Sequence, residues 1–320
     1  MIYRPFRMRI FLLMSLMGAS LPGHSSNLAK NTKICGSLLK KLYNKEDFSE
    51  EKAFQLFQKS DPSEFTLHAE REMVYRVQHE KTGISFFLRF EKHFSDLPRE
   101  NFAAHFIRSA PGGLAPASHL LPVQQATRWR SYFLEHWEDY GDSMRSSKIM
   151  KNMSRGQNNI SITVAYPGKS LIRYLRENSF QSPEDLDPRL LQRVSDHVSL
   201  YLLLGIPDPH AGNLLVHDGN VIGIDLEQLD IDLQKPINGP LSFRQTDFIS
   251  PLAHFRKNPE AQTPEFFIRR ISAETLDWIK NLSEGELKKT AEASRYDLKE
   301  DQIKAILLRR DALLELRERP

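Results

Sequence analysis

Residues 205–228 read GIPDPHAGNLLVHDGNVIGIDLEQ, and this stretch carries the strongest structural signal in the chain. It holds two short apolar runs, NLLVH and NVIGID, separated by Asp218-Gly219, a dipeptide that allows the positive φ angles of a tight hairpin turn. The pattern predicts a β-hairpin whose second strand ends at Asp225. Because a hairpin folds back on itself, we expect Asp225 to return to the neighbourhood of Asn213.

The segment before this hairpin predicts a buried helix. The stretch PRLLQRVSDHVSLYLLLG has apolar residues at helical spacing as far as Gly205. Asp187 and Pro188 stand at its start, where an N-cap acceptor and a first helical residue without a needed N–H group are favoured. The candidate functional loop therefore follows directly from a helix expected to lie in the core.

The first half of the chain predicts a small sheet with helices. Residues 65–92 alternate in hydropathy on both sides of HEKTG and indicate a β-hairpin ending in a strand. Residues 99–110 have one apolar face and stop at PGG, which predicts a helix. The remaining expectations are a strand in PASHLLPVQQ (116–125), a helix at 126–140 and a strand in ISITVAYPGKSL (160–171).

Together these patterns predict an α+β chain with two lobes. We expect a helical lead-in at 27–64, a small β-rich lobe at 65–168, and a mainly helical lobe at 169–320 that closes with three helices. Residues 141–158 are polar, basic and rich in turn formers, which favours a mobile, solvated insertion over a surface for an acidic partner.

Composition narrows the classes of function. The 320 residues include 44 Lys plus Arg and 41 Asp plus Glu, so the formal net charge is only +3 and nucleic acid is not an expected partner. The length allows two lobes, each with its own core. A single cysteine, Cys35, excludes an intramolecular disulfide and a cysteine-rich zinc module.

The N-terminus predicts export. Three arginines precede the apolar run IFLLMSLMGASL at 10–21, and small residues follow where cleavage is expected, so residues 1–26 are interpreted as an export signal. The run is too short to span a bilayer comfortably, and we expect no stable membrane insertion after its removal. The alternative is an ordinary buried helix, which would leave the protein in the cytoplasm.

The chemistry is expected around the predicted hairpin. Asp208 and Asn213 follow the buried helix five residues apart, and Asp225 ends the hairpin. Carboxylate and amide oxygens suit Mg²⁺ held jointly with substrate phosphates, while a free carboxylate can accept a hydroxyl proton. Each residue is also common in turns, and a metal site made from His210, His217 and Asp225 is a weaker alternative.

This constellation resembles the catalytic and metal-binding loops of the protein-kinase-like fold, most closely the phosphatidylinositol 3- and 4-kinase superfamily and its bacterial relatives. The matching residues are the order DxHxxN at 208–213 followed by Ile224-Asp225. The resemblance implies that Asp208 is the catalytic base, that His210 has a structural or phosphate-facing role, that Asn213 is a metal ligand and that Asp225 is the principal metal ligand.

The same resemblance assigns the upstream half of the site. Arg89 in FFLRF would hold the nucleotide phosphates in place of the lysine of kinases and pair with Glu100, with Lys92 as the nearby alternative. The stretch YPGKSL at 166–171 would be the hinge between the lobes. No GxGxxG loop occurs between residues 60 and 90, so the element that covers the phosphates is not identified.

The implied activity is phosphate transfer from ATP with Mg²⁺ or Mn²⁺ to a protein or lipid substrate. The missing lysine and glycine loop leave a pseudokinase scaffold as an alternative, and nucleotidyl transfer would use the same metal-bound triphosphate. An exported enzyme that needs ATP is expected to be secreted or delivered into a host cell, as bacterial effectors are, rather than kept in the periplasm.

Overall fold

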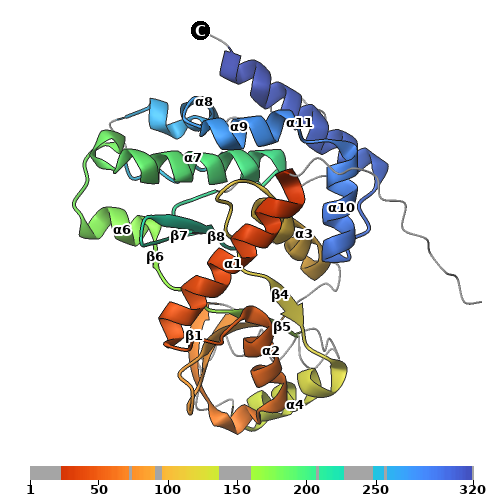
Figure 1. Cartoon of the computed structure of the whole chain (residues 1–320). Coiled ribbons are helices and arrows are strands. Elements are labelled where there is room, and N and C mark those ends of the chain that lie inside the picture. The colour runs from red at the N-terminus through yellow and green to blue at the C-terminus, as the bar shows by residue number, and fades with distance from the viewer. Residues whose placement is uncertain are drawn as a thin grey trace, which may run out of the picture.

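The computed structural model describes residues 23–71, 74–90, 96–136, 160–206, 209–226, 248–255 and 258–318. Within these ranges the chain is α+β, with a lobe built around an antiparallel sheet and a larger lobe built from helices (Figure 1). Each lobe has its own cluster of buried apolar side chains. Residues 1–22 of the expected export signal (1–26) and the expected insertion at 141–158 lie outside the described residues.

The first lobe contains a five-stranded sheet in the order β1-β2-β3-β5-β4. Its neighbouring strands all pair antiparallel. The segment expected to form one hairpin, 65–92, contributes three of the strands. The sheet consists of β1 (Phe65–Arg71), β2 (Val74–His79), β3 (Ser85–Phe90), β4 (Ser118–Leu120) and β5 (Ile160–Val164).

Alternation along β3 determines which side chains enter this core. Phe86, Leu88 and Phe90 are buried, so Arg89 points to the opposite face of the sheet. Two helices, α2 (Glu50–Lys59) and α4 (Val123–Glu135), pack Phe57 and Trp129 against the buried face, where the two rings stack with centroids 5.0 Å apart. Strand β3 thus presents apolar side chains to the core on one face and the charged Arg89 on the other.

One expected element is wrong in extent. The strand expected over 116–125 covers only Ser118–Leu120, and α4 already begins at Val123. Pro122 stands between the two elements as the residue before the helix. Proline has no N–H group for a strand ladder but is readily accommodated at a helix start, which explains why the strand stops there.

The second lobe is organised around α7 (Pro188–Leu203), most of whose side chains are buried. The carboxylate of Asp187 accepts hydrogen bonds from the N–H groups of Arg189 at 2.9 Å and Leu190 at 3.1 Å, which confirms the predicted cap. The helices α8 (Pro264–Ile268) and α11 (Glu300–Glu318) pack against α7, and α10 (Glu284–Ser294) packs against both α11 and α3 (Asp96–Ser109). The lobe also contains α6 (Leu171–Glu177) and α9 (Ala273–Lys280). Short 3₁₀ helices occupy Pro183–Asp185 and Glu260–Gln262 in this lobe, and a further one, Pro62–Glu64, directly precedes β1 in the first lobe.

The predicted hairpin is present as β7 (Leu214–His217) and β8 (Asn220–Gly223). The short strand β6 (Lys169–Ser170) pairs antiparallel with β7. Asp218 and Gly219 both have positive φ, 48° and 68°, as the predicted tight turn requires. The hairpin lies between the two cores. Alternate residues face different clusters: Leu214 and Val221 belong to the helical core, while Ile222 belongs to the core of the sheet lobe.

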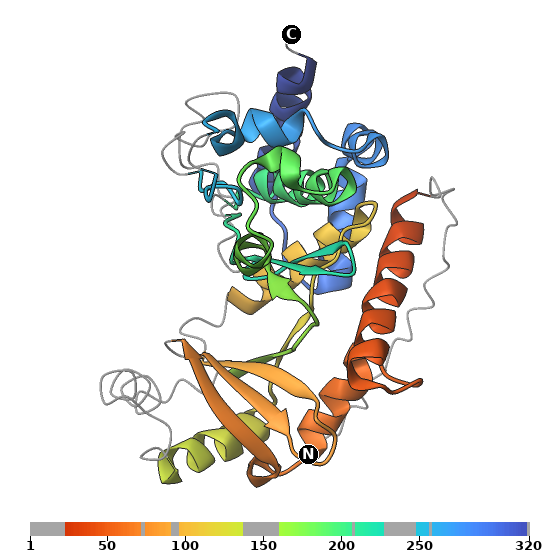
Figure 2. The same cartoon turned by 90° about the vertical axis from the view of Figure 1, so that its left-hand side faces the viewer.

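Two further helices connect the lobes. The buried side chains of α3 (Asp96–Ser109) pack with the helical core, although α3 lies within the range expected for the β-rich lobe. Helix α1 (Gly23–Tyr43) runs along both lobes (Figure 2) and begins inside the range expected for the export signal. Its Asn31 amide donates to the carbonyls of Arg108 and Ala110, at 2.7 and 2.6 Å, at the end of α3.

None of the described helices is both long and apolar enough to cross a membrane.

Candidate functional site

Three charged side chains from separate elements meet where the hairpin faces the sheet lobe. Arg89 comes from β3, Glu100 from α3, and Asp225 follows β8. The Arg89 Nη1 atom lies 3.3 Å from Glu100 Oε2, and its Nη2 atom lies 3.9 Å from Asp225 Oδ1. One guanidinium therefore lies between two carboxylates that are far apart in sequence.

The three side chains of this cluster are buried to different degrees. The Glu100 side chain is only 9% exposed, while Arg89 and Asp225 keep 23% and 25% of their side-chain surface. A carboxylate that has lost most of its water needs a cationic or hydrogen-bonding partner, and Arg89 supplies one. The exposed portions of Arg89 and Asp225 remain accessible to a ligand.

The hairpin places Asn213 and Asp225 at the same end of its two strands. Leu214 pairs with Gly223, and the N–H of Ile224 donates to the Asn213 carbonyl at 2.8 Å. Asn213 is almost fully buried, at 3% exposure. The expected convergence of the two positions is thus present in the backbone.

Asp225 adopts an unusual backbone conformation, with φ at 60°. Residues other than glycine reach this left-handed region at a cost of roughly 1–2 kcal/mol, although Asp and Asn tolerate it better than most. Such conformations persist when the surroundings hold them. The contacts of the neighbouring peptide groups therefore help to hold Asp225 in this conformation.

Tyr201 supplies one of these contacts, although no motif in the sequence marks it as a site residue. Its hydroxyl lies 3.2 Å from the Ile224 carbonyl and 3.3 Å from the Asn213 carbonyl. Burial raises the pKa of the Tyr201 phenol, and the nearby charge of Asp225 raises it further, so the hydroxyl stays protonated and donates. In the sequence Tyr201 is one apolar position of a buried helix, and only the later Gly223 hints that another side chain approaches closely.

His210 shapes the loop that carries Asn213. The Gly212 N–H donates to His210 Nδ1 at 2.8 Å, and the Asn213 N–H donates to the His210 carbonyl at 2.8 Å. A Cβ atom at Gly212 would lie 2.5 Å from His210 Cε1, so a larger residue there would displace the imidazole from this position. These contacts show that His210 helps to hold the turn before Asn213.

Two of the expected residues lie outside the described part of the chain. They are Asp208, the expected base, and Lys92, the alternative to Arg89. His217 lies at the hairpin turn with its Nε2 3.6 Å from Asp218 Oδ2, at the opposite end of the strands from Asp225. Within the described ranges, no three His, Cys, Asp or Glu side chains group as a metal site.

The donor set at the hairpin base nevertheless has the chemistry that Mg²⁺ prefers. Asp225 offers carboxylate oxygens and Asn213 an amide oxygen, and both are hard ligands. Two protein ligands suffice when substrate phosphates and water complete the coordination. The residues present thus fit a metal that binds together with a phosphate-bearing substrate.

Comparison with known proteins adds no relative. No protein-family model matches the chain, and no curated protein matches its sequence. A function is therefore proposed from the residues and contacts described above.

Proposed function

We propose that the protein is an ATP- and Mg²⁺-dependent phosphotransferase with a two-lobed, protein-kinase-like fold. The observation that carries the proposal is the position of the Arg89 guanidinium between Glu100 and Asp225. The resemblance to kinases predicts Arg89 and Glu100 as an ion pair and Asp225 as a metal ligand, and in the structure all three side chains lie together. Their convergence is what a phosphate site next to a metal site requires.

In this proposal Arg89 holds the phosphates and Glu100 holds Arg89. The guanidinium has five donors in a planar fork, so it can keep a hydrogen bond to Glu100 and still offer donors to phosphate oxygens. Its contact with Asp225 is longer, at 3.9 Å, and is the weaker of the two. We expect a triphosphate to replace Asp225 as the second partner of Arg89.

Asn213 and Asp225 would hold Mg²⁺. When bound, the ion neutralises phosphate charge and orients the transferred group. Asp208, by the same resemblance, would accept the proton of the attacking hydroxyl on a protein or lipid substrate. The bonds from the Gly212 N–H to His210 Nδ1 and from the Asn213 N–H to the His210 carbonyl hold the turn that leads into Asn213.

The test is a product analysis with a matched charge control. Purified full-length chain is incubated with ATP and Mg²⁺ or Mn²⁺, and nucleotides and protein adducts are identified by mass. Asp225→Asn is expected to abolish ADP formation, because it removes the charge of the principal metal ligand. Asp218→Asn removes the same charge at the exposed hairpin turn and should leave ADP formation unchanged.

The other outcomes separate the alternatives. An Asp225-dependent AMP adduct would replace phosphoryl transfer by nucleotidyl transfer. Metal-independent nucleotide binding without turnover would favour a scaffold. Equal turnover by the Asp225→Asn variant and the parent chain would refute the assignment of the site.

A further inference from the structure

We propose that Tyr201 is a positioning residue whose hydroxyl fixes the backbone of Asp225 and links it to the Asn213 loop. The consequence for metal binding rests on the proposed function, whereas the backbone role does not. No sequence motif marks this tyrosine. The inference comes from its contacts with the two loops that carry the candidate metal ligands.

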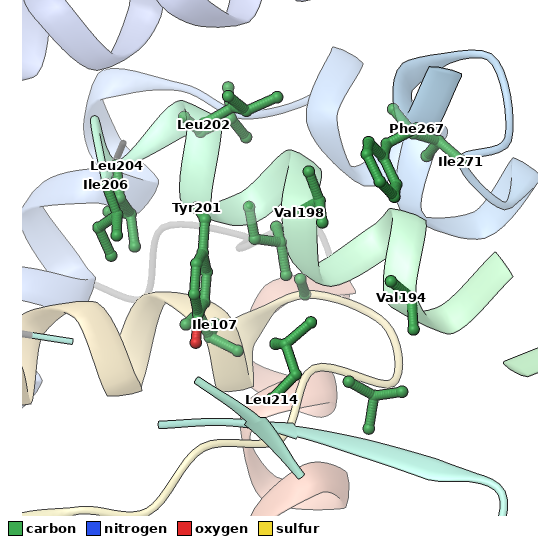
Figure 3. Packing of buried hydrophobic residues seen from close by; sticks show 14 of the residues in the cluster. Ile107, Val194, Val198, Tyr201, Leu202, Leu204, Ile206, Leu214, Phe267 and Ile271 are labelled. Atoms are coloured by element: carbon green, nitrogen blue, oxygen red, sulfur yellow. The ribbon is translucent and has the colours of Figure 1, made fainter. Parts of the chain in front are cut away.

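The position of Tyr201 gives its hydroxyl few choices. The side chain is fully buried and extends from α7 towards the strand that carries Leu214 (Figure 3). Its single hydroxyl proton is shared between the carbonyls of Asn213 and Ile224, at 3.3 and 3.2 Å. A buried hydroxyl that lost these acceptors would remain unsatisfied, so the contacts are costly to break.

The two acceptors connect both sides of the candidate metal site. The Ile224 carbonyl belongs to the peptide group that ends at the nitrogen of Asp225. Holding that peptide plane limits rotation about the N–Cα bond of Asp225, which stands at a φ of 60°. The Asn213 carbonyl also accepts the Ile224 N–H at 2.8 Å, so the same atoms tie the loop to the hairpin.

Gly223 provides the space for this arrangement. A Cβ atom at position 223 would lie 2.6 Å from the Tyr201 hydroxyl oxygen and 3.1 Å from Cε1. Real Cβ atoms do not approach that closely, so any other residue would push the ring away from the carbonyls. The missing Cβ atom of Gly223 therefore leaves the room that the Tyr201 ring occupies.

A comparison of unfolding constants tests the backbone role without a ligand. Asp225→Gly and Asp225→Ala both remove the carboxylate and differ only in the Cβ atom. With Tyr201 present, we expect the glycine variant to be the more stable of the two, because alanine is strained at positive φ. Its unfolding equilibrium constant should be smaller than that of the alanine variant by about fivefold or more. In the Tyr201→Phe background this preference should vanish or reverse, since residue 225 is free to relax. An unchanged preference would overturn the proposal.

A binding measurement tests the consequence for the metal. Mn²⁺ binding is followed by electron paramagnetic resonance in the presence of a non-hydrolysable ATP analogue. Tyr201→Phe should weaken Mn²⁺ binding roughly tenfold, the effect of losing one well-placed hydrogen bond at the site. Tyr296→Phe is the control, because it removes a partly buried hydroxyl that contacts Gln302. It should bind Mn²⁺ like the parent chain.

The two measurements distinguish the possible failures. Parent-like Mn²⁺ affinity in Tyr201→Phe would overturn the role of Tyr201 at the metal site. A parent chain with no Asp225-dependent Mn²⁺ binding would overturn the proposed function instead. The unfolding comparison would then decide by itself whether Tyr201 holds Asp225.

Discussion

At the scale of single residues, Arg89 shows why arginine suits this position. A lysine ammonium is a compact point charge on a flexible stem, while a guanidinium presents donors along two edges. Arg89 uses these edges towards Glu100 on one element and Asp225 on another. In the proposed function, Arg89 stands where kinases have a lysine. Its guanidinium could hold the nucleotide phosphates as that lysine does, although with a different hydrogen-bond geometry.

A second residue, Asp196, predicts how stability depends on pH. It lies on α7, is 8% exposed, and accepts the Ser272 N–H at 2.8 Å before α9. Burial raises the pKa of Asp196 to about 6. The folded state thus binds more protons than the unfolded state between about pH 3.8 and 6, and stability falls as pH rises through this window.

Replacing Asp196 with asparagine tests that assignment. The amide keeps an acceptor for the Ser272 N–H but removes the buried charge, so Asp196→Asn should gain stability at pH 8, by on the order of 3 kcal/mol at most. Near pH 4 most of the gain should disappear. Thermal unfolding at both pH values, beside the exposed control Asp277→Asn, measures this. A gain of equal size at both pH values would contradict the assignment.

Local chemistry at single residues is what sequence reasoning predicts best. Asp187 caps α7, and Asp218-Gly219 forms the hairpin turn, because both depend only on neighbouring backbone groups. Tyr201 could not be found in this way. Its two acceptors lie 12 and 23 residues away, and nothing in the local apolar pattern distinguishes it from its neighbours.

At the scale of elements, a buried polar network joins α2, α3 and the segment after β5. Glu50 Oε1 accepts hydrogen bonds from Arg108 Nη2 at 2.8 Å, from the Tyr166 hydroxyl at 2.8 Å and from the Ala117 N–H at 3.1 Å. Burial alone would raise the pKa of Glu50, but Arg108 and these donors hold it below its ordinary value. The carboxylate therefore stays charged in the interior.

Removing this carboxylate should be strongly destabilising. Glu50→Ala leaves Arg108 buried without its counter-charge, which typically costs about 3–5 kcal/mol. Glu51→Ala is the matched control, because Glu51 is the next residue of α2 and is exposed. Chemical denaturation should show the loss for the first variant alone. The difference should shrink as pH falls below about 4.5, because the unfolded chain then binds a proton at Glu50 that the folded chain, with its lowered pKa, does not yet bind. Similar stabilities at neutral pH would contradict this role.

The partners of α2 and α3 could not be predicted from the sequence, because they lie far away along the chain. Glu50 and Arg108 are 58 residues apart, and the periodicity of α2 or α3 contains no sign of the pairing. Helix α3 was expected from its apolar face, yet that face contacts the helical core rather than the sheet. Periodicity indicates that a face is buried but does not identify the partner that buries it.

At the scale of the whole molecule, the candidate site lies where the two cores approach each other. The hairpin belongs to both cores, and α1 contacts both lobes through Asn31 and Tyr43. The Tyr43 hydroxyl donates to the Ala165 carbonyl at 2.9 Å, next to the expected hinge. Arg89 of one lobe and Asp225 of the other thus meet because several elements fix the lobes together.

The most direct measurement is a crystal structure of the full-length chain with Mn²⁺ and a non-hydrolysable ATP analogue, recorded to locate manganese by anomalous scattering. The account predicts a manganese peak coordinated by Asp225 and Asn213. It also predicts phosphate oxygens against Arg89, with Glu100 still paired to the guanidinium. Nucleotide bound away from Arg89, or manganese bound without Asp225, would contradict the proposed site and the activity derived from it.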